Sequence, residues 1–264
     1  MRFTRLITCG DSFTEGMSDE IVNGQYRGWA DRIADVMAKE VSGFMYANLA
    51  VRGKLVHQVV ADQIPAALKF ITGKETLVTF HAGANDVLRP NYKSEVVLPL
   101  YAKAVREIAS TGATVLLFTV LESTGAKGKT ADVWANRFGK FNENVRTVAA
   151  EVGAIVADAN EEGRLSDRRF LARDRLHLNE MGHVRVAQGL LEKLDLPFDT
   201  NWKNPLPPQE DIPRSKKIAE DLHWFVTFMI PWIWRRLRGK SSGDGRVPKH
   251  LAPIAWPTLT TDLH

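Results

Sequence analysis

The sequence predicts a three-layer α/β/α fold, in which helices cover both faces of a five-stranded parallel sheet. Short apolar segments rich in Val, Ile, Leu, Thr and Phe alternate with longer segments of helical periodicity, and this alternation favours a parallel sheet packed between helices. Residues 115–118, Val-Leu-Leu-Phe, are apolar at every position, which is typical of a strand buried on both faces. With 264 residues, 44% of them hydrophobic and 25% charged, the chain can bury a full core of this kind.

Each element of this fold is predicted from its own segment. The apolar segments that predict strands are 3–9, 44–51, 76–82, 114–121 and 154–158. The segments with helical periodicity are 29–41, 55–71, 95–111, 134–152 and 178–194. Gly112 and Gly153 follow two of these helices, where glycine commonly ends a helix, and Asn179 can cap the last one. This order of elements is flavodoxin-like.

The last quarter of the chain differs from the rest in composition. Residues 201–264 contain ten Lys or Arg against six Asp or Glu, so their net charge of +4 equals that of the whole chain. They also contain five of the seven tryptophans and eight of the twelve prolines. We therefore expect a domain over residues 1–197 and a C-terminal extension over residues 198–264, made of a Pro-rich linker and an amphipathic helical segment.

The extension contains a basic, Trp-rich segment at residues 213–240, and Pro231 should kink or split its helix. Its aromatic residues are too apolar to remain bare in water. Three interpretations stay open: the segment docks on the domain and lines the entrance of a site, it forms a homo-oligomer or partner interface, or it makes a peripheral membrane contact. Nucleic acid is not an expected partner, because a net charge of +4 over 64 residues is a weak electrostatic footprint.

The turn Gly10-Asp11-Ser12 directly follows the first predicted strand and precedes a helix-compatible segment. The carboxyl edge of a parallel sheet is where open α/β folds place their chemistry. Ser12 can therefore act as a nucleophile if a base and oxyanion donors surround it. Taken alone, the turn favours the other interpretation, a serine that caps the next helix.

Four short blocks together resemble those of the GDSL family, also called the SGNH hydrolases. They are Gly10-Asp11-Ser12 with Gly16, Asn48 to Gly53, Gly83-Ala84-Asn85-Asp86, and Asp174-Arg175-Leu176-His177. The resemblance covers about residues 1–195 and implies the fold predicted above. It also implies a serine hydrolase that cleaves carboxylic esters or thioesters through an acyl-enzyme.

The resemblance implies a role for each block. Ser12 would be the nucleophile, His177 the general base and Asp174 the acid that orients it. The oxyanion hole would consist of the Ser12 N–H, the Gly53 N–H and the Asn85 side chain. The second block has Ala50 where the family usually has a glycine, so Gly53 can also be a plain turn glycine.

Alternatives to these roles remain at this stage. Asp174 and His177 can form a surface salt bridge, His183 lacks an acid three residues before it, and Asp86 is a less favoured acid partner than Asp174. We assign Asp11 and Asp86 to structure, as acceptors for backbone N–H groups. Arg52 and Arg89, each next to an oxyanion block, can contact a polar or acidic substrate group or can be solvated surface arginines.

Several other classes of site are not expected. Cys9 is the single cysteine, which excludes an intramolecular disulfide and a cysteine-based zinc site, and a core position is expected for it. The seven histidines lack ligand spacing, so no metal is predicted. The sequence contains no Gly-x-Gly-x-x-Gly, Walker lysine or His-Glu-x-x-His motif, so no cofactor is predicted. No apolar segment typical of a secretory signal precedes the first strand, so we expect a cytoplasmic protein.

The sequence thus favours a GDSL-type serine esterase or lipase acting on a small-molecule ester. The alternative is a non-catalytic binding or scaffold protein, in which the fold is kept and the extension binds a partner or a membrane surface.

Overall fold

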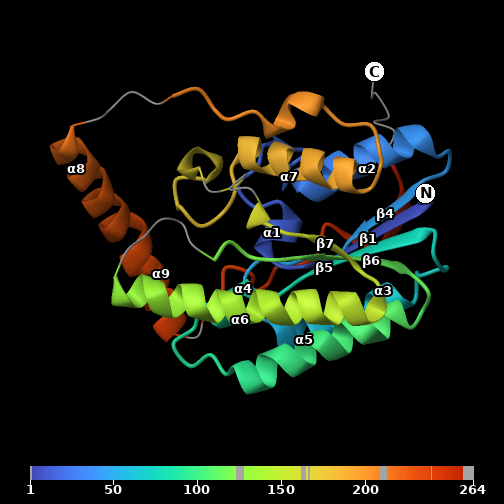
Figure 1. Cartoon of the computed structure of the whole chain (residues 1–264), viewed down its shortest axis with the longest axis horizontal. Helices are drawn as coiled ribbons and strands as arrows, with labels where there is room; N and C mark the ends of the chain where they lie inside the picture. Colours follow the sequence, from blue (N-terminus) through green and yellow to red (C-terminus); the bar gives the residue numbers. More distant parts are fainter. Residues whose placement is uncertain are drawn as a thin grey trace.

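The computed structural model describes residues 2–122, 128–161, 165, 167–208, 213–238 and 240–257, and its centre is a six-stranded sheet of order β7-β6-β5-β1-β4-β8 (Figure 1). Five strands are parallel, and β8 pairs with β4 in the antiparallel sense. The strands are β1 (Arg5–Gly10), β4 (Met45–Asn48), β5 (Thr76–His81), β6 (Thr114–Phe118), β7 (Ile155–Ala157) and β8 (His250–Ala255). A separate hairpin pairs β2 (Ile21–Val22) with β3 (Gln25–Tyr26).

Helices cover both faces of the sheet. In Figure 1, α2 (Gly28–Glu40) and α7 (Glu180–Lys193) lie above it, while α5 (Ser94–Ala109) and α6 (Lys129–Val152) lie below, on the same face as α3 (Val56–Leu68). Alternate residues of each strand point to opposite faces. Accordingly Leu6, Leu77 and Leu116 pack with α2 and α7, whereas their neighbours Ile7, Val78 and Leu117 pack with the other three helices.

The predicted three-layer α/β/α fold is confirmed, but the number of strands is wrong. Each of the five predicted strands and five predicted helices coincides with an observed element. Gly153 ends α6 in the left-handed conformation, and the Asn179 side chain caps α7 by accepting from Gly182 N at 3.1 Å. The sheet has a sixth strand, β8, from the part of the chain predicted as linker and helix.

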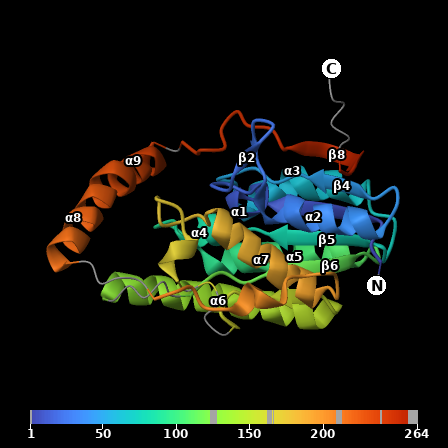
Figure 2. The same cartoon turned by 90° about the horizontal axis from the view of Figure 1, so that it is seen from above.

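The first half of the C-terminal extension is a helical rod, which we call the arm. It consists of α8 (Arg214–Trp224), a π-helical stretch (Phe225–Met229) and α9 (Ile230–Leu237), and it stands at one end of the molecule (Figures 1 and 2). The predicted disruption at Pro231 takes the form of the π-helical stretch just before it, where wider turns accommodate the missing N–H, and the rod is not split. Residue 239 of the predicted segment lies outside the described residues.

The second half of the extension, residues 240–257, we call the strap. It ends in β8, which adds a strand to the outer edge of β4 (Figure 2). Lys249 Nζ lies 2.8 Å from each carboxylate oxygen of Asp31 in α2 and donates to the carbonyls of Tyr26 and Arg27. The strap is therefore integrated into the sheet, and the composition boundary near residue 198 does not separate two folded units. None of the described helices combines the length and the apolar character that a bilayer crossing requires.

Candidate active site

Ser12 is the first residue of the short helix α1 (Ser12–Glu15), directly after β1. The strand end is fixed by Gln63, whose side chain accepts from Gly10 N at 2.7 Å and donates to Gly10 O at 2.9 Å. A Cβ atom on Gly10 would collide with the carbonyl of His81, so this close approach requires glycine. Asp11 then caps α1 by accepting from Phe13 N at 3.2 Å. The sharp, buried turn fixes the Ser12 hydroxyl at the carboxyl edge of the sheet.

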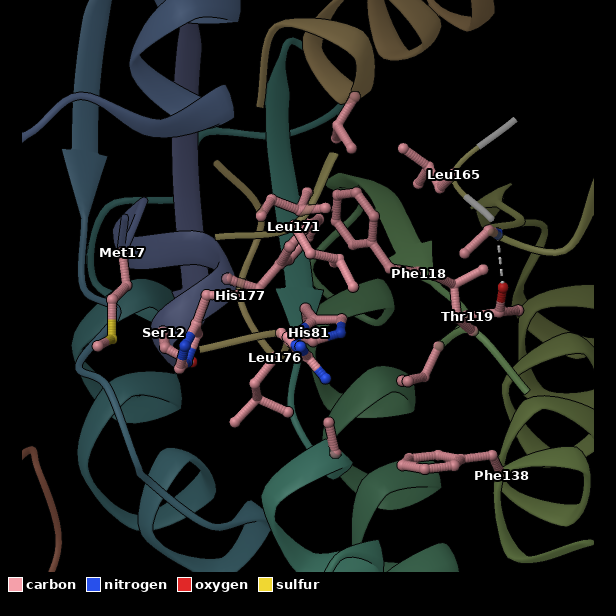
Figure 3. Close-up of a pocket in the computed structure, with 18 of the residues that line it drawn as sticks. Ser12, Met17, His81, Phe118, Thr119, Phe138, Leu165, Leu171, Leu176 and His177 are labelled. Carbon is pink, nitrogen blue, oxygen red and sulfur yellow. Dashed lines mark hydrogen bonds between the residues drawn. The ribbon is translucent and has the colours of Figure 1, made fainter. Parts of the chain in front are cut away.

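His177 and Asp174 come from the loop before α7 and meet Ser12 there. Ser12 Oγ lies 3.0 Å from His177 Nε2, and His177 Nδ1 lies 2.6 Å from Asp174 Oδ2. Figure 3 shows Ser12 and His177 side by side at the cavity. The other carboxylate oxygen of Asp174 accepts from the N–H groups of Leu176 and His177, at 2.9 and 3.0 Å. The structure thus joins the three predicted residues in one hydrogen-bonded series, although Ser12 and Asp174 are 162 positions apart in the sequence.

The environment of Asp174 favours its charged form. Burial alone would raise the pKa of this carboxyl, but the hydrogen bonds from the His177 side chain and from two backbone N–H groups hold the pKa below its usual value. An ionised Asp174 can keep a proton on His177 Nδ1. His177 Nε2 is then the nitrogen that faces the Ser12 hydroxyl as an acceptor.

The alternative residues have structural contacts. His183 accepts from Trp29 N at 3.3 Å and donates from Nε2 to Met17 O at 3.1 Å, and burial lowers its pKa to about 4. Asp86 accepts from Val56 N at 2.9 Å at the start of α3, and burial raises its pKa to about 6. The structural assignment of Asp11 and Asp86 agrees with their backbone contacts, and the acid in contact with His177 is Asp174.

The predicted oxyanion donors lie in neighbouring loops. Asn85, in α4 (Ala84–Val87), lines the cavity with Ser12, and its Nδ2 donates to Asp11 Oδ2 at 3.1 Å and to Lys54 O at 3.2 Å. The second contact places Asn85 beside the loop that contains Gly53. Gly53 has a φ of 73°, and its carbonyl accepts from Ser241 Oγ of the strap at 3.2 Å. A side chain at Gly53 would collide with Ser241.

The two arginines that could contact substrate are placed elsewhere. Arg52 forms a buried ion pair with Glu15, in which Nε lies 2.9 Å from Oε1, and its backbone N–H donates to the same carboxylate at 2.7 Å. Arg89 accepts from the Arg137 side chain through its carbonyl at 3.0 Å. Among the described residues, neither arginine belongs to the cavity lining. Arg52 is therefore a structural residue that links its loop to α1.

A cavity of about 560 Å³ opens above Ser12, His177 and Asn85. Most of the side chains around it are apolar, and Figure 3 shows Phe118, Phe138 and Leu176 among them. The arm contributes four further residues, Trp224, Phe228, Met229 and Trp232. The volume lies within the usual range of small-molecule sites. In the described part of the chain, no group of three or more His, Cys, Asp or Glu side chains is placed to hold a metal ion.

Two residues at the site were not singled out from the sequence. His81, at the end of β5, has Nδ1 3.4 Å from Asp11 Oδ1 and packs against Phe13 with ring centroids 4.6 Å apart. Its place at a strand end, two residues before the Gly83 block, is a signal that could have found it. Trp224 of the arm donates from Nε1 to Asp174 O at 2.9 Å. Fifty positions separate these two residues, and no local pattern links them.

Comparisons with known proteins identify a family and similar folds. The model of the GDSL-like lipase/acylhydrolase family matches residues 8–185. Among solved structures, the fold is similar to a member of the lipolytic protein G-D-S-L family from Veillonella parvula, with 23% identity, a TM-score of 0.55, and coverage of 71% of this chain and 96% of that one. It is also similar to an acetylxylan esterase from Geobacillus stearothermophilus, with 18% identity, a TM-score of 0.57, and coverage of 74% and 96%.

A third similar structure is an α/β hydrolase enzyme from the metagenome of Lake Arreo, with 20% identity, a TM-score of 0.56, and coverage of 72% of this chain and 94% of that one. At these identities the likeness shows a shared fold. A search of the curated proteins finds no match. Each of the three alignments covers almost the whole of the similar protein, whereas about a quarter of this chain lies outside the alignment.

Proposed function

The chain belongs to the GDSL-like lipase/acylhydrolase family, and from this premise we propose that it cleaves carboxylic esters or thioesters through a covalent acyl-enzyme on Ser12. The observation that carries the proposal is the hydrogen-bonded series from Asp174 through His177 to Ser12, which opens onto the cavity. A serine hydroxyl needs such a base to become a nucleophile near neutral pH.

In the proposed reaction, Ser12 Oγ attacks the carbonyl carbon while its proton passes to His177 Nε2. The imidazolium that forms is stabilised by the carboxylate of Asp174. When the tetrahedral intermediate collapses, the bond to the alcohol or thiol breaks, and the leaving group takes the proton from His177. A water molecule then gives a proton to the same nitrogen, attacks the acyl carbon and releases the acid, and the proton returns to Ser12.

For the tetrahedral intermediate, we propose donors at the Ser12 N–H, the Gly53 N–H and the Asn85 side chain. Asn85 supports this role because it lines the cavity with Ser12 and lies beside the loop of Gly53. Its amide hydrogens are directed at Asp11 and Lys54 in the free protein, so one of them must turn toward the oxyanion. Removal of one such donor typically lowers turnover by about 10²–10³-fold, which is the expected effect of Asn85→Ala.

Hydrolysis of p-nitrophenyl acetate by the wild type and by Ser12→Ala tests the proposal. We expect the variant to lose about 10⁴-fold or more in kcat, because the covalent route is removed. A fluorophosphonate should modify the wild type on the peptide that contains Ser12. Equal, slow release of nitrophenol by both proteins would instead support the alternative of a binding or scaffold protein.

A further inference from the structure

The arm forms part of the wall of the catalytic cavity. Trp224, Phe228, Met229 and Trp232 all line the same cavity as Ser12 and His177. The rings of Trp224 and Phe228 are stacked, with centroids 6.2 Å apart and an angle of 24° between their planes. The body of the protein contributes Phe138 and Trp134 of α6 to the same cavity. An aromatic wall of this kind binds hydrocarbon through dispersion and through release of water.

Contacts with the catalytic loop fix this wall relative to the reacting atoms. Trp224 Nε1 donates to the carbonyl of Asp174 at 2.9 Å. The next residue of the loop, Arg175, pairs with Asp221 at 2.6 Å, and its guanidinium lies 5.0 Å from the centre of the Trp224 ring. The arm is thus attached to the same loop that supplies Asp174 and His177. These contacts fix the distance between its apolar wall and the proposed site of bond cleavage.

We propose that the arm builds an acyl-chain subsite, so that the preferred substrates are esters of medium-chain and long-chain aliphatic acids. This inference rests on the proposed function. The acyl group occupies the site through both steps, because it becomes joined to Ser12 in the first and is released by water in the second, while the alcohol departs after the first. A chain held against Phe228 and Trp232 therefore contributes to both acylation and deacylation.

A series of p-nitrophenyl esters from acetate to octanoate tests the subsite, because only the acyl chain changes. In the wild type we expect kcat/KM to rise by about tenfold or more from acetate to octanoate, since each methylene group removed from water contributes up to about fourfold. Phe228→Ala should lower the octanoate-to-acetate ratio of kcat/KM by about tenfold. Trp232→Ala should lower the same ratio.

The arm offers matched controls for both substitutions. Phe225 and Trp234 are 47% and 54% exposed and do not belong to the described cavity lining. Phe225→Ala and Trp234→Ala should therefore keep the wild-type ratio. A ratio that Phe228→Ala leaves unchanged, or that Phe225→Ala lowers equally, overturns the subsite. Loss of acetate hydrolysis in Ser12→Ala remains the separate test of the proposed function.

A second feature of the arm is independent of the cavity: a row of exposed apolar side chains. Ile218, Leu222 and Val226 follow one another at helical spacing and are 58%, 63% and 52% exposed, and Ile233 continues the row on α9. Residues 213–238 contain six Lys or Arg against two Asp or Glu. A cationic helix with an exposed apolar row complements the chemistry of an anionic lipid surface. We infer that this row lies on such a surface.

Co-sedimentation with vesicles tests the lipid contact. We expect the wild type to bind vesicles of phosphatidylcholine with phosphatidylglycerol and to bind pure phosphatidylcholine vesicles at least tenfold more weakly. Leu222→Glu should abolish binding, whereas Val247→Glu, on an exposed valine of the strap, should not. Equal binding by the two variants, or a wild-type dimer that Leu222→Glu dissociates, overturns the inference; the second result would identify a second copy as the occupant.

Discussion

The two halves of the C-terminal extension have a similar basic, Trp-containing composition but different relations to the body. The arm touches the body at the loop that contains Asp174 and Arg175, and every described residue of α8 before Trp224 is exposed. The strap adds β8 to the sheet and inserts the Lys249 ammonium beside the buried Asp31 carboxylate. Composition alone does not tell such segments apart, because a tryptophan or a lysine acquires its role from its partner.

This difference predicts that the strap contributes to the stability of the fold, whereas the arm contributes to substrate preference. Substitutions in the strap remove buried pairs and packed rings, and they should lower the free energy of unfolding. The side chains of the arm face solvent or the cavity. Equivalent substitutions there should leave the free energy of unfolding nearly unchanged and should change substrate preference. Two predictions compare the halves directly, and a third tests the strap alone.

The largest expected effect belongs to Lys249→Met. Burial raises the pKa of the Asp31 carboxyl, and Lys249→Met removes the cation that limits this rise. Breaking a buried ion pair by removing one partner costs about 3–5 kcal/mol, so we expect the Tm to fall by about 10 °C. Lys216→Met, on the exposed face of α8, should change stability by less than about 0.5 kcal/mol. Equal Tm values for the two variants would contradict the distinction.

A smaller difference is expected between two tryptophans. Trp256 packs edge-on against Tyr46, with centroids 5.1 Å apart, and donates to Asp35 Oδ1 at 2.9 Å. Trp256→Ala should cost about 2 kcal/mol, since the ring is only partly buried. Trp234→Ala in the arm should cost less than about 0.5 kcal/mol. Urea denaturation of both variants measures the difference, and a larger loss for Trp234→Ala would reverse our assignment.

The smallest effect concerns pH. Burial, together with the neighbouring Lys249, lowers the pKa of His250 in β8 to about 4. Between about pH 6.5 and pH 4 the unfolded state therefore binds a proton that the folded state does not, so stability decreases as the pH falls through this window. We expect His250→Gln to reduce this loss by about 1 kcal/mol or less, because the half-buried ring is partly screened by solvent.

Thermal unfolding of the wild type and of His250→Gln across this pH range measures the effect. His183 contributes in the same window, since its pKa is also about 4, but it does so in both proteins. The difference between them isolates His250. Parallel curves would show that β8 is insensitive to this protonation.

The sequence alone predicts the elements whose pattern lies within one short segment. The five parallel strands are short, mostly apolar segments, and the helices that separate them have a clear period, so the order of these elements follows from pattern alone. Their ends do not, because α6 begins at Lys129, five residues before the predicted start of its helix. The blocks that follow strands place Ser12 and Asn85 at one edge of the sheet, and the block before the last helix places Asp174 and His177 in the loop that precedes α7. The structure brings them together as those positions predict.

The features that could not be predicted depend on distant partners. β8 contains Pro253 and lacks an alternating pattern, and it forms because β4 offers an open edge, where proline is tolerated. Trp224 contacts Asp174 only because the arm packs beside the loop that contains Asp174 and His177. Arg52, which stands next to Gly53 in the sequence, turns toward Glu15 and not toward a substrate. Each of these outcomes depends on tertiary contacts that no sequence window contains.

The antiparallel pairing of β8 with β4 has a consequence for synthesis on the ribosome. β4 ends at Asn48, whereas its outer partner begins at His250, so about 200 residues are translated before the pair can form. During that interval the N–H and C=O groups on one side of β4 are an open template for another chain. The nascent protein therefore passes through a stage in which the edge of β4 is unpaired and prone to association with other chains, until β8 pairs with it.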